Sequence, residues 1–354
     1  MTAHWEFAHG PKQFDKIVKK LRYPMLAINC YRKNGRELAY KPYHIIERND
    51  LQIGIIGIAA TIVDKTMPDH FSEGLYFTLG WEELQKYVKQ LRKIEKVDLI
   101  IVLSHLGYPQ ELKFAEEVDG IDVLLSSHTN NQIYEAVISN GVIVIQSGCH
   151  GSFIGRLDIE VSEKRVKDFK HHLITVDASI DPDESALDII ERSLGPLREE
   201  LRTVVGQTMT ALNRSRVLES TMDNLLLKAI RETTGAQLAF SNGWRYGVPI
   251  PPGKMTVNDL WNIVPTNPLI SICKITEDLW KMMEENLEYT FSSDPYRQMG
   301  GYVKRCLGLN IYFKVENPEF RRIQDFYVNG KKLEKQDVFS LLLGITRHTK
   351  QIWA

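Results

Sequence analysis

The chain has 354 residues, a length that predicts about two domains of ordinary size. A hydrophobic fraction of 43% and a charged fraction of 25% are typical of a globular protein, and 44 lysine and arginine residues balance 45 aspartate and glutamate residues. This balance argues against nucleic acid or an anionic membrane surface as a partner. No run of eighteen or more apolar residues predicts a membrane span, and the four cysteines form no C-x-x-C pair.

The first hundred residues predict helices and strands joined by short turns. The opening segment Met1–Gly10 crowds His4, Trp5 and His9 together and lacks the residue order of a secretory signal peptide. The elements expected after it are helices at Phe14–Leu21 and Trp81–Ile94 and strands at Tyr23–Asn29, Tyr43–Arg48 and Leu51–Ile58. Asn49 and Asp50 lie between the last two strands, and such a pair predicts a hairpin turn.

The central stretch predicts two buried strands that each end at a histidine. The apolar runs Val97–Leu103 and Ile121–Leu125 stop at polar segments that contain His105 and His128, and the residues between the runs favour a helix. Because chemistry in such α/β units gathers at the carboxyl ends of the strands, both histidines are expected at the same rim of a sheet. Two imidazoles there suit a divalent metal ion, although each could instead cap a strand or form a hydrogen bond within its loop.

The rest of the chain changes character near residue 180. Strands are expected at Gly141–Gln146 and Arg156–Val161, whereas Pro182–Asn213 has long helical periodicity. The elements expected after it are helices at Met222–Thr233, Val257–Ile263 and Thr276–Tyr289 and strands at Gln237–Ser241, Leu269–Ile275, Leu309–Val315 and Arg321–Val328. These patterns predict an α/β protein with a first domain at residues 1–180, a linker helix at 181–213 and a second domain at 214–354.

Five motifs occur in an order that matches a known family. They are HWEFAHG at the start, SHLG and SSHTN in the central stretch, GSFIGRLDIEV after it and SNGWRYG in the second domain. Together they resemble the 5'-nucleotidase family of dinuclear metallohydrolases, whose members join a calcineurin-like metallophosphatase domain to a separate substrate-binding domain. The resemblance implies an incomplete metallophosphatase β-sandwich flanked by helices, followed by an α/β substrate domain of the 5'-nucleotidase type.

The resemblance assigns metal ligands to the first domain. The family's SHLG histidine falls on His105, the first histidine of its GHTH segment falls on His128, and its next ligand falls on Asn130. The HWEF segment resembles the family's GNHEF, which puts His4 in the place of an asparagine ligand and Trp5 in the place of a catalytic histidine. These four ligands, His4, His105, His128 and Asn130, are expected to hold Mn²⁺ or Zn²⁺, and the three histidines are also the expected catalytic residues.

Trp5 departs from the family pattern in a way that affects proton transfer. An indole nitrogen only donates a hydrogen bond and cannot supply a proton as histidine does. General acid chemistry would then fall to another group such as His9 or His150, although either could be an ordinary solvated loop residue.

Substrate contacts are expected from the second domain. Asn242 and Arg245 match the asparagine and arginine of the family's NGGGIR loop, where arginine grips an anionic group through two parallel hydrogen bonds. The segment Pro265–Asn267 lacks the family's stacking aromatic, and Tyr246 or Trp244 could take its place, although either could be a core residue. Arg305, in the stretch DPYRQMGGYVKR, is a candidate for additional positive charge at the site. Arg245 could alternatively form a surface ion pair.

Two family segments have no counterpart in the sequence. In the family, a D-x-H pair and the bridging aspartate of a GD segment precede the GNHE motif and hold the first metal. A bridging carboxylate spaces two ions about 3.5 to 4 Å apart, so at most one metal is expected here in place of the family's two. The chain is therefore expected to be N-terminally truncated and of doubtful activity.

The implied activity is hydrolysis of phosphate monoesters, with nucleotides as the usual substrates, by attack of a metal-bound hydroxide. The HWEF and DPYRQMGGYVKR segments also resemble the thiosulfohydrolase branch, so hydrolysis of a cysteine S-sulfonate on a sulfur-carrier protein is an alternative. A further alternative is an inactive chain that binds a metal ion or a small anion. The expected partner is a small anionic substrate, and no location is predicted, because relatives are commonly periplasmic or secreted while this sequence shows no signal peptide.

Overall fold

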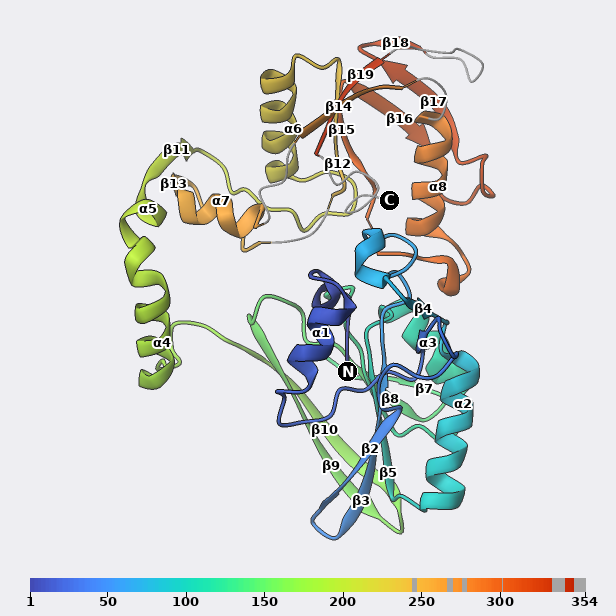
Figure 1. Ribbon diagram of the computed structural model, residues 1–354. Coiled ribbons are helices and arrows are strands. Elements are labelled where there is room, and N and C mark those ends of the chain that lie inside the picture. Colours follow the sequence, from blue (N-terminus) through green and yellow to red (C-terminus); the bar gives the residue numbers. More distant parts are fainter. Residues whose placement is uncertain (244–246, 266–269, 276–278, 301, 333–340, 347–354) are drawn as a thin grey trace.

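The computed structural model describes the chain except for residues 244–246, 266–269, 276–278, 301, 333–340 and 347–354. Figure 1 shows a lower lobe built from the N-terminal part of the chain and an upper lobe built from the C-terminal part, with a helical connection at one side. The mixed α/β architecture predicted from the sequence is confirmed.

The N-terminal lobe is built on a mixed sheet whose described strands follow the order β2-β3-β5-β6-β8-β7. These strands are β2 (Tyr43–Arg48), β3 (Leu51–Ile58), β5 (Leu99–Ser104), β6 (Val123–Leu125), β7 (Val137–Ser139) and β8 (Val142–Ile145). The inner strands β3, β5, β6 and β8 run parallel, and the antiparallel strands β2 and β7 lie at the edges. The predicted hairpin of β2 and β3 is confirmed, and its two turn residues, Asn49 and Asp50, have φ angles of 49° and 60°.

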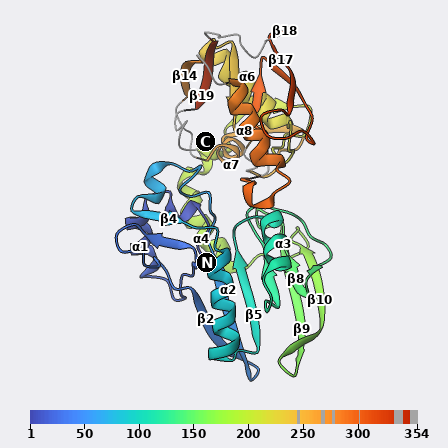
Figure 2. The same cartoon turned by 90° about the vertical axis from the view of Figure 1, so that its right-hand side faces the viewer.

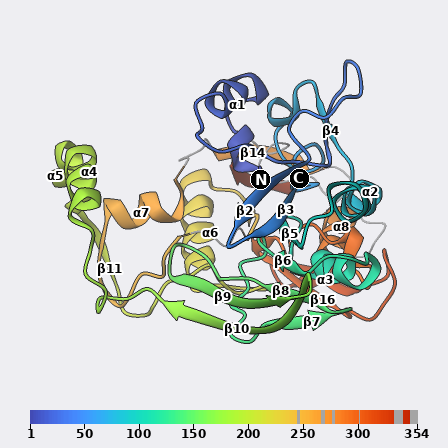
Figure 3. The ribbon, with the colours of Figure 1, turned by 90° about the horizontal axis from the view of Figure 1, so that it is seen from below.

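Alternating side chains of this sheet enter two different cores. On one face, Ile100, Val102 and Leu124 pack against helices α2 (Trp81–Gln90) and α3 (Tyr108–Glu117). On the other face, residues such as Ile101, Val123 and Ile143 pack against a long hairpin, which consists of β9 (Phe153–Ser162) and β10 (Arg165–Thr175) (Figure 3). Because both faces are covered, the parallel strands are apolar along nearly their whole length.

A third core holds the N-terminal segment against the sheet. Its elements are η1 (Trp5–Phe7), α1 (Pro11–Val18), β1 (Cys30–Arg32), η2 (Asp69–Ser72) and β4 (Leu75–Phe77). Phe7 is fully buried there, and its ring lies 5.0 Å from that of Phe14. The predicted strand at Tyr23–Asn29 is wrong, because the backbone of this segment pairs with two different partners. Leu26 forms an isolated bridge with Lys41, whereas the backbone N–H of Ile28 donates to the oxygen of Gly57.

The connection between the lobes begins as a helix and ends as a strand. It consists of α4 (Glu184–Leu194), the 3-10 turn η4 (Gly195–Leu197), α5 (Arg198–Arg202) and β11 (Val204–Thr208). The helix predicted over Pro182–Asn213 is therefore too long. Two valines open β11 and favour extended backbone, and the strand pairs with β13 (Gly253–Thr256), which lies far along the chain. The domain boundaries at residues 180 and 213 stay predictions.

The C-terminal lobe combines two small sheets with three helices among its described residues. Its strands are β12 (Leu238–Ser241), β14 (Ile270–Ile275), β15 (Arg305–Leu307), β16 (Leu309–Phe313), β17 (Ile323–Val328), β18 (Lys331–Lys332) and β19 (Leu341–Thr346). Its helices are α6 (Thr221–Thr234), α7 (Val257–Ile263) and α8 (Leu279–Phe291). The apolar face of α8 packs against β12, β16 and β17 in a core that includes Leu238, Leu287 and Phe326.

The two lobes meet at helix α3. A 3-10 turn after α8, η5 (Pro295–Arg297), reaches this helix (Figure 2). The Tyr296 hydroxyl donates a hydrogen bond of 2.6 Å to Oε2 of Glu117, and the Tyr296 ring lies 5.6 Å from that of Phe114. Gln110 Nε2 donates to the backbone oxygen of Gln298 at 2.7 Å. Within the described part of the chain, no helix is long and apolar enough to span a bilayer.

Candidate metal centre

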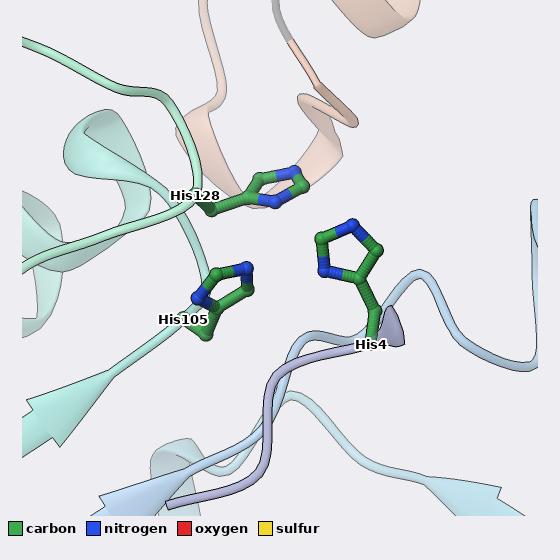
Figure 4. Close-up of side chains that lie close together, drawn as sticks. All are labelled: His4, His105 and His128. Carbon is green, nitrogen blue, oxygen red and sulfur yellow. The ribbon is translucent and has the colours of Figure 1, made fainter. Parts of the chain in front are cut away.

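Three imidazole rings from separate segments of the chain face one another (Figure 4). The ring centroid of His4 lies 5.0 Å from that of His105 and 5.1 Å from that of His128, and the latter two centroids are 5.1 Å apart. One nitrogen of each ring lies within 4.8 Å of the corresponding nitrogens of the other two. Among histidine, cysteine, aspartate and glutamate side chains in the described residues, this is the one group arranged to surround an ion.

Two of the rings are brought together by parallel pairing of β5 with β6. Leu103 is the register partner of Leu125, so the loops that follow the two strands leave the sheet side by side. His105 directly follows β5 and anchors its backbone N–H on the oxygen of Ile58, while His128 lies three residues beyond β6 with a φ of 72°. The prediction that both histidines lie at one rim of the sheet is confirmed.

The third ring reaches the rim because the N-terminal segment is fixed on both sides of it. The backbone N–H of Thr2, a fully buried residue, donates to the oxygen of Leu26 at 3.2 Å. Ala3 accepts a hydrogen bond from the backbone of Ala60, just beyond the end of β3. His4 then precedes η1, whose Phe7 side chain is buried in the N-terminal core.

A hydroxyl group orients the imidazole of His105. Ser127 Oγ lies 2.6 Å from Nδ1 of His105 and donates its own proton to the backbone oxygen of Ser104 at 2.8 Å. Because the hydroxyl has one proton, its oxygen must accept the N–H of His105 Nδ1. Nε2 of this ring is then the unprotonated nitrogen, which is the form that binds a metal.

The environment keeps the rings of His4 and His105 neutral. Burial and the neighbouring ring of His128 lower the pKa of His4 to about 3, and burial together with both neighbouring rings lowers the pKa of His105 further. Nδ1 of His4 and Nε2 of His105 are buried without a hydrogen-bond partner. Buried polar atoms are ordinarily satisfied, so these two nitrogens fit a site whose partner is a metal ion.

Other residues expected near the site lie outside this triangle. Asn130 is half-buried in the loop of His128, two residues further on, with a φ of 60°. Trp5 adjoins His4, with ring centroids 5.8 Å apart. His9 and His150 are exposed, and neither belongs to the histidine group. The roles predicted for Asn130 and Trp5 stay predictions.

In the C-terminal lobe, the predicted substrate residues have different outcomes. Asn242 is buried directly after β12, whereas Arg245, Tyr246 and the alternative aromatic Trp244 lie outside the described residues. Arg305 is enclosed: its Nε donates to Asp223 Oδ2 at 3.1 Å, and its terminal nitrogens donate to backbone oxygens of Arg216, Val217 and Val303. This arrangement corrects the prediction that Arg305 contacts substrate, because four of its five donors are occupied inside the protein.

The partners of Arg305 were not predicted from the sequence. Asp223 also binds Arg214, with Nε and Oδ1 3.0 Å apart, and the side chains of the three residues are at most 3% exposed. A Cβ at Gly243 would lie 2.9 Å from Cζ of Arg305, so the loop after Asn242 rests directly on this guanidinium. Arg305 therefore supports the loop in which substrate contacts were expected.

Comparisons with known proteins agree with this architecture. Residues 203–344 match the family described as 5'-nucleotidase, C-terminal domain. The trifunctional nucleotide phosphoesterase protein YfkN of Bacillus subtilis is 26% identical over 316 residues, which make up 84% of this chain and 21% of YfkN. The C-terminal part of the chain, residues 203–344, is therefore similar to the C-terminal domain of 5'-nucleotidases.

Two solved structures show the same fold. Sulfate thiohydrolase SoxB from Thermus thermophilus superposes with a TM-score of 0.91 at 23% identity, over 99% of this chain and 66% of that one. A 5'-nucleotidase precursor, also from Thermus thermophilus, superposes with a TM-score of 0.82 at 20% identity, over 97% of this chain and 72% of that one. The chain spans 21% to 65% of the length of the first three curated relatives that it matches. YfkN and the 5'-nucleotidase precursor are, by their names, hydrolases.

Proposed function

We propose that this chain hydrolyses phosphate monoesters of nucleotides at a divalent metal ion held by His4, His105 and His128. The observation that carries the proposal is the triangle of half-buried imidazoles at the carboxyl ends of β5 and β6. The name of YfkN, a nucleotide phosphoesterase, supports nucleotides as the substrate class.

The donor set favours a zinc-like ion over manganese. Imidazole nitrogen suits zinc, whereas manganese prefers carboxylate, carbonyl and water oxygens. Three histidines also leave a coordination position open, as catalytic zinc sites do, and the amide oxygen of Asn130 is a proposed additional donor. When bound, such an ion polarises a phosphoryl oxygen and lowers the pKa of water.

The protein's own groups prepare the site for this ion. Burial keeps His4 and His105 unprotonated at neutral pH, so the ion does not compete with protons for these two nitrogens. Ser127 holds the ring of His105 in the required tautomer. The proposed contacts to the anionic group of the substrate are Asn242 and Arg245. The proposed contact to the base is Tyr246.

Phosphate release from adenosine 5'-monophosphate tests the proposal. The purified chain is stripped with a chelator and then supplied with Zn²⁺ or Mn²⁺, and turnover is expected to return with the metal. His105→Ala is expected to reduce turnover by at least about 100-fold, the upper end of the loss produced by removing even an outer-shell partner. His172→Ala, which changes an exposed histidine of β10, is the control. Absence of turnover with either metal, or full turnover by His105→Ala, would contradict the proposal.

Trp5 favours a second candidate activity, hydrolysis of a cysteine S-sulfonate. Its ring adjoins His4, with ring centroids 5.8 Å apart, and an indole cannot transfer a proton to a leaving group as histidine can. An S-sulfonated cysteine peptide assayed in parallel with the nucleotide distinguishes the two. Release of sulfate without release of phosphate from the nucleotide would favour the second candidate.

A further inference from the structure

Glu111 is a fully buried carboxyl group beneath the loops that carry two of the histidines. It lies in the first turn of α3 and is 0% exposed. Burial raises its pKa to about 7, although hydroxyl and backbone N–H groups that point at it act in the opposite direction. Burying an acid at this position is costly, and a helix of ordinary packing does not require it.

The hydrogen bonds of Glu111 join the two histidine loops. Oε1 accepts from the backbone N–H groups of Leu106 at 3.0 Å and Gly107 at 3.2 Å, which are the two residues that follow His105. Oε2 accepts from the hydroxyl of Ser126, which lies two residues before His128. A single carboxyl group therefore contacts the chain next to both ligands without touching either ring in the contacts that the structure shows.

Further polar contacts connect the same two loops. Gln146, 2% exposed and directly after β8, donates from Nε2 to Ser126 Oγ at 2.7 Å and to the backbone oxygen of Ser127 at 2.8 Å. The backbone N–H of Tyr108 donates to Thr129 Oγ1 at 3.1 Å. The loops approach so closely that a Cβ at Gly107 would lie 3.0 Å from Cγ2 of Thr129.

We propose that Glu111 is a positioning residue for the metal centre, which fixes the separation of His105 and His128 by bonding to both of their loops. The inference rests on the proposed function, because it requires that these histidines bind one ion. Helix capping alone does not account for the contacts. A cap needs only the N–H groups at the start of α3, whereas the bond to Ser126 reaches across to the next strand of the sheet.

Cobalt binding tests the proposal without relying on turnover. Co²⁺ is titrated into the metal-free chain, and its visible absorption reports both affinity and coordination geometry. Glu111→Ala is expected to weaken Co²⁺ binding by about 10- to 100-fold, as loss of outer-shell support does in other metal sites, and to change the absorption bands. Glu111→Gln is expected to restore most of the affinity, because its amide oxygen can accept both N–H groups and its amide nitrogen can donate to Ser126.

A matched control lies on the same helix. Glu116→Ala removes an exposed carboxylate that pairs only with a surface lysine among the contacts shown, and it is expected to leave Co²⁺ binding unchanged. Circular dichroism establishes whether each variant is folded. If Glu111→Ala does not fold, Ser126→Ala takes its place, since it deletes the link from Glu111 to the second loop together with one hydrogen bond from Gln146, and it is expected to weaken binding several-fold.

The outcomes separate this inference from the proposed function. A folded Glu111→Ala that binds Co²⁺ with wild-type affinity and wild-type bands overturns the positioning role, and so does unchanged binding by Ser126→Ala when Glu111→Ala is unfolded. If the wild-type chain and His105→Ala bind Co²⁺ equally well, the histidine centre itself is wrong, and the proposed function fails with it.

Discussion

Ser127 Oγ accepts a hydrogen bond from His105 Nδ1 across 2.6 Å and donates one through its own hydroxyl proton to the backbone oxygen of Ser104. This chain of two hydrogen bonds ends on a backbone atom, which has no alternative protonation state. The tautomer of His105 is therefore fixed by the fold before any ion arrives, and less ordering remains to be done on binding.

Ser127→Ala is expected to weaken metal binding while leaving the fold intact. The ring of His105 loses the acceptor that orients it, and loss of such a partner typically costs about 10- to 100-fold in metal affinity. Isothermal titration with Zn²⁺ measures the effect. Ser162→Ala, at the exposed end of β9, is the control, and equal affinity of Ser127→Ala and wild type would show that Ser127 does not orient the ring.

Asp223→Ala is expected to destabilise the C-terminal lobe strongly. The change leaves Arg214 and Arg305 buried without their shared carboxylate, and breaking a buried ion pair in this way costs about 3 to 5 kcal/mol of unfolding free energy. Urea denaturation measures the loss. Glu232→Ala on the same helix removes an exposed partner of Lys228 and should change the unfolding free energy by no more than about 0.5 kcal/mol. Similar losses for the two variants would contradict the assignment.

Glu111 should make the stability of the metal-free chain depend on pH. Its pKa is raised in the folded state from 4.5 to about 7, so its contribution is fully present below about pH 4.5 and is lost as the pH rises through 7. The shift corresponds to about 3 kcal/mol. The unfolding free energy of wild type relative to Glu111→Gln, measured in urea with a chelator present, is therefore expected to fall by about this amount between pH 4.5 and pH 8. A difference that is constant over this range would show that Glu111 does not titrate in this window.

Tyr296→Phe is expected to loosen the contact between the lobes only slightly. It removes the hydrogen bond to Glu117, which contributes about 0.5 to 1.5 kcal/mol or less at this partly exposed position, but it retains the ring that packs on Phe114. Tyr296→Ala removes both and should have the larger effect. Hydrogen exchange of the α3 backbone measures the change, and equal exchange in the two variants would mean that the ring contact does not hold the lobes together.

The sequence predicted best what depends on neighbouring residues. Parallel strands that end at His105 and His128 follow from local apolar runs, and parallel pairing alone brings their ends together. The place of His4 came from the resemblance of HWEF to a family motif, because no local pattern connects it with a residue a hundred positions away. The end of the linker helix at Arg202 depends on pairing with β13, which lies equally far outside any local pattern.

Sequence patterns did not predict which charged side chains are buried. Charged residues are almost always exposed, so Arg305 was interpreted as a ligand contact instead of an internal support. Its burial depends on Asp223, which is 82 residues earlier and looks like an ordinary acidic residue at the start of a helix. Glu111 likewise has the sequence position of a helix-start acid, and only the three-dimensional fold places Ser126 beside it.

His4 precedes His105 by 101 residues and His128 by 124, so an ion bound to all three rings would cross-link the N-terminus to the middle of the chain. A covalent cross-link that closes a loop of about 100 residues lowers the conformational entropy of the unfolded chain and so stabilises the folded state by about 4 to 5 kcal/mol. A metal ion that binds only the folded chain also stabilises the folded state. Occupancy of the histidines and resistance to heat should then rise together. The metal ion that is proposed to take part in the chemistry would also hold the N-terminal segment that contains His4 against the sheet.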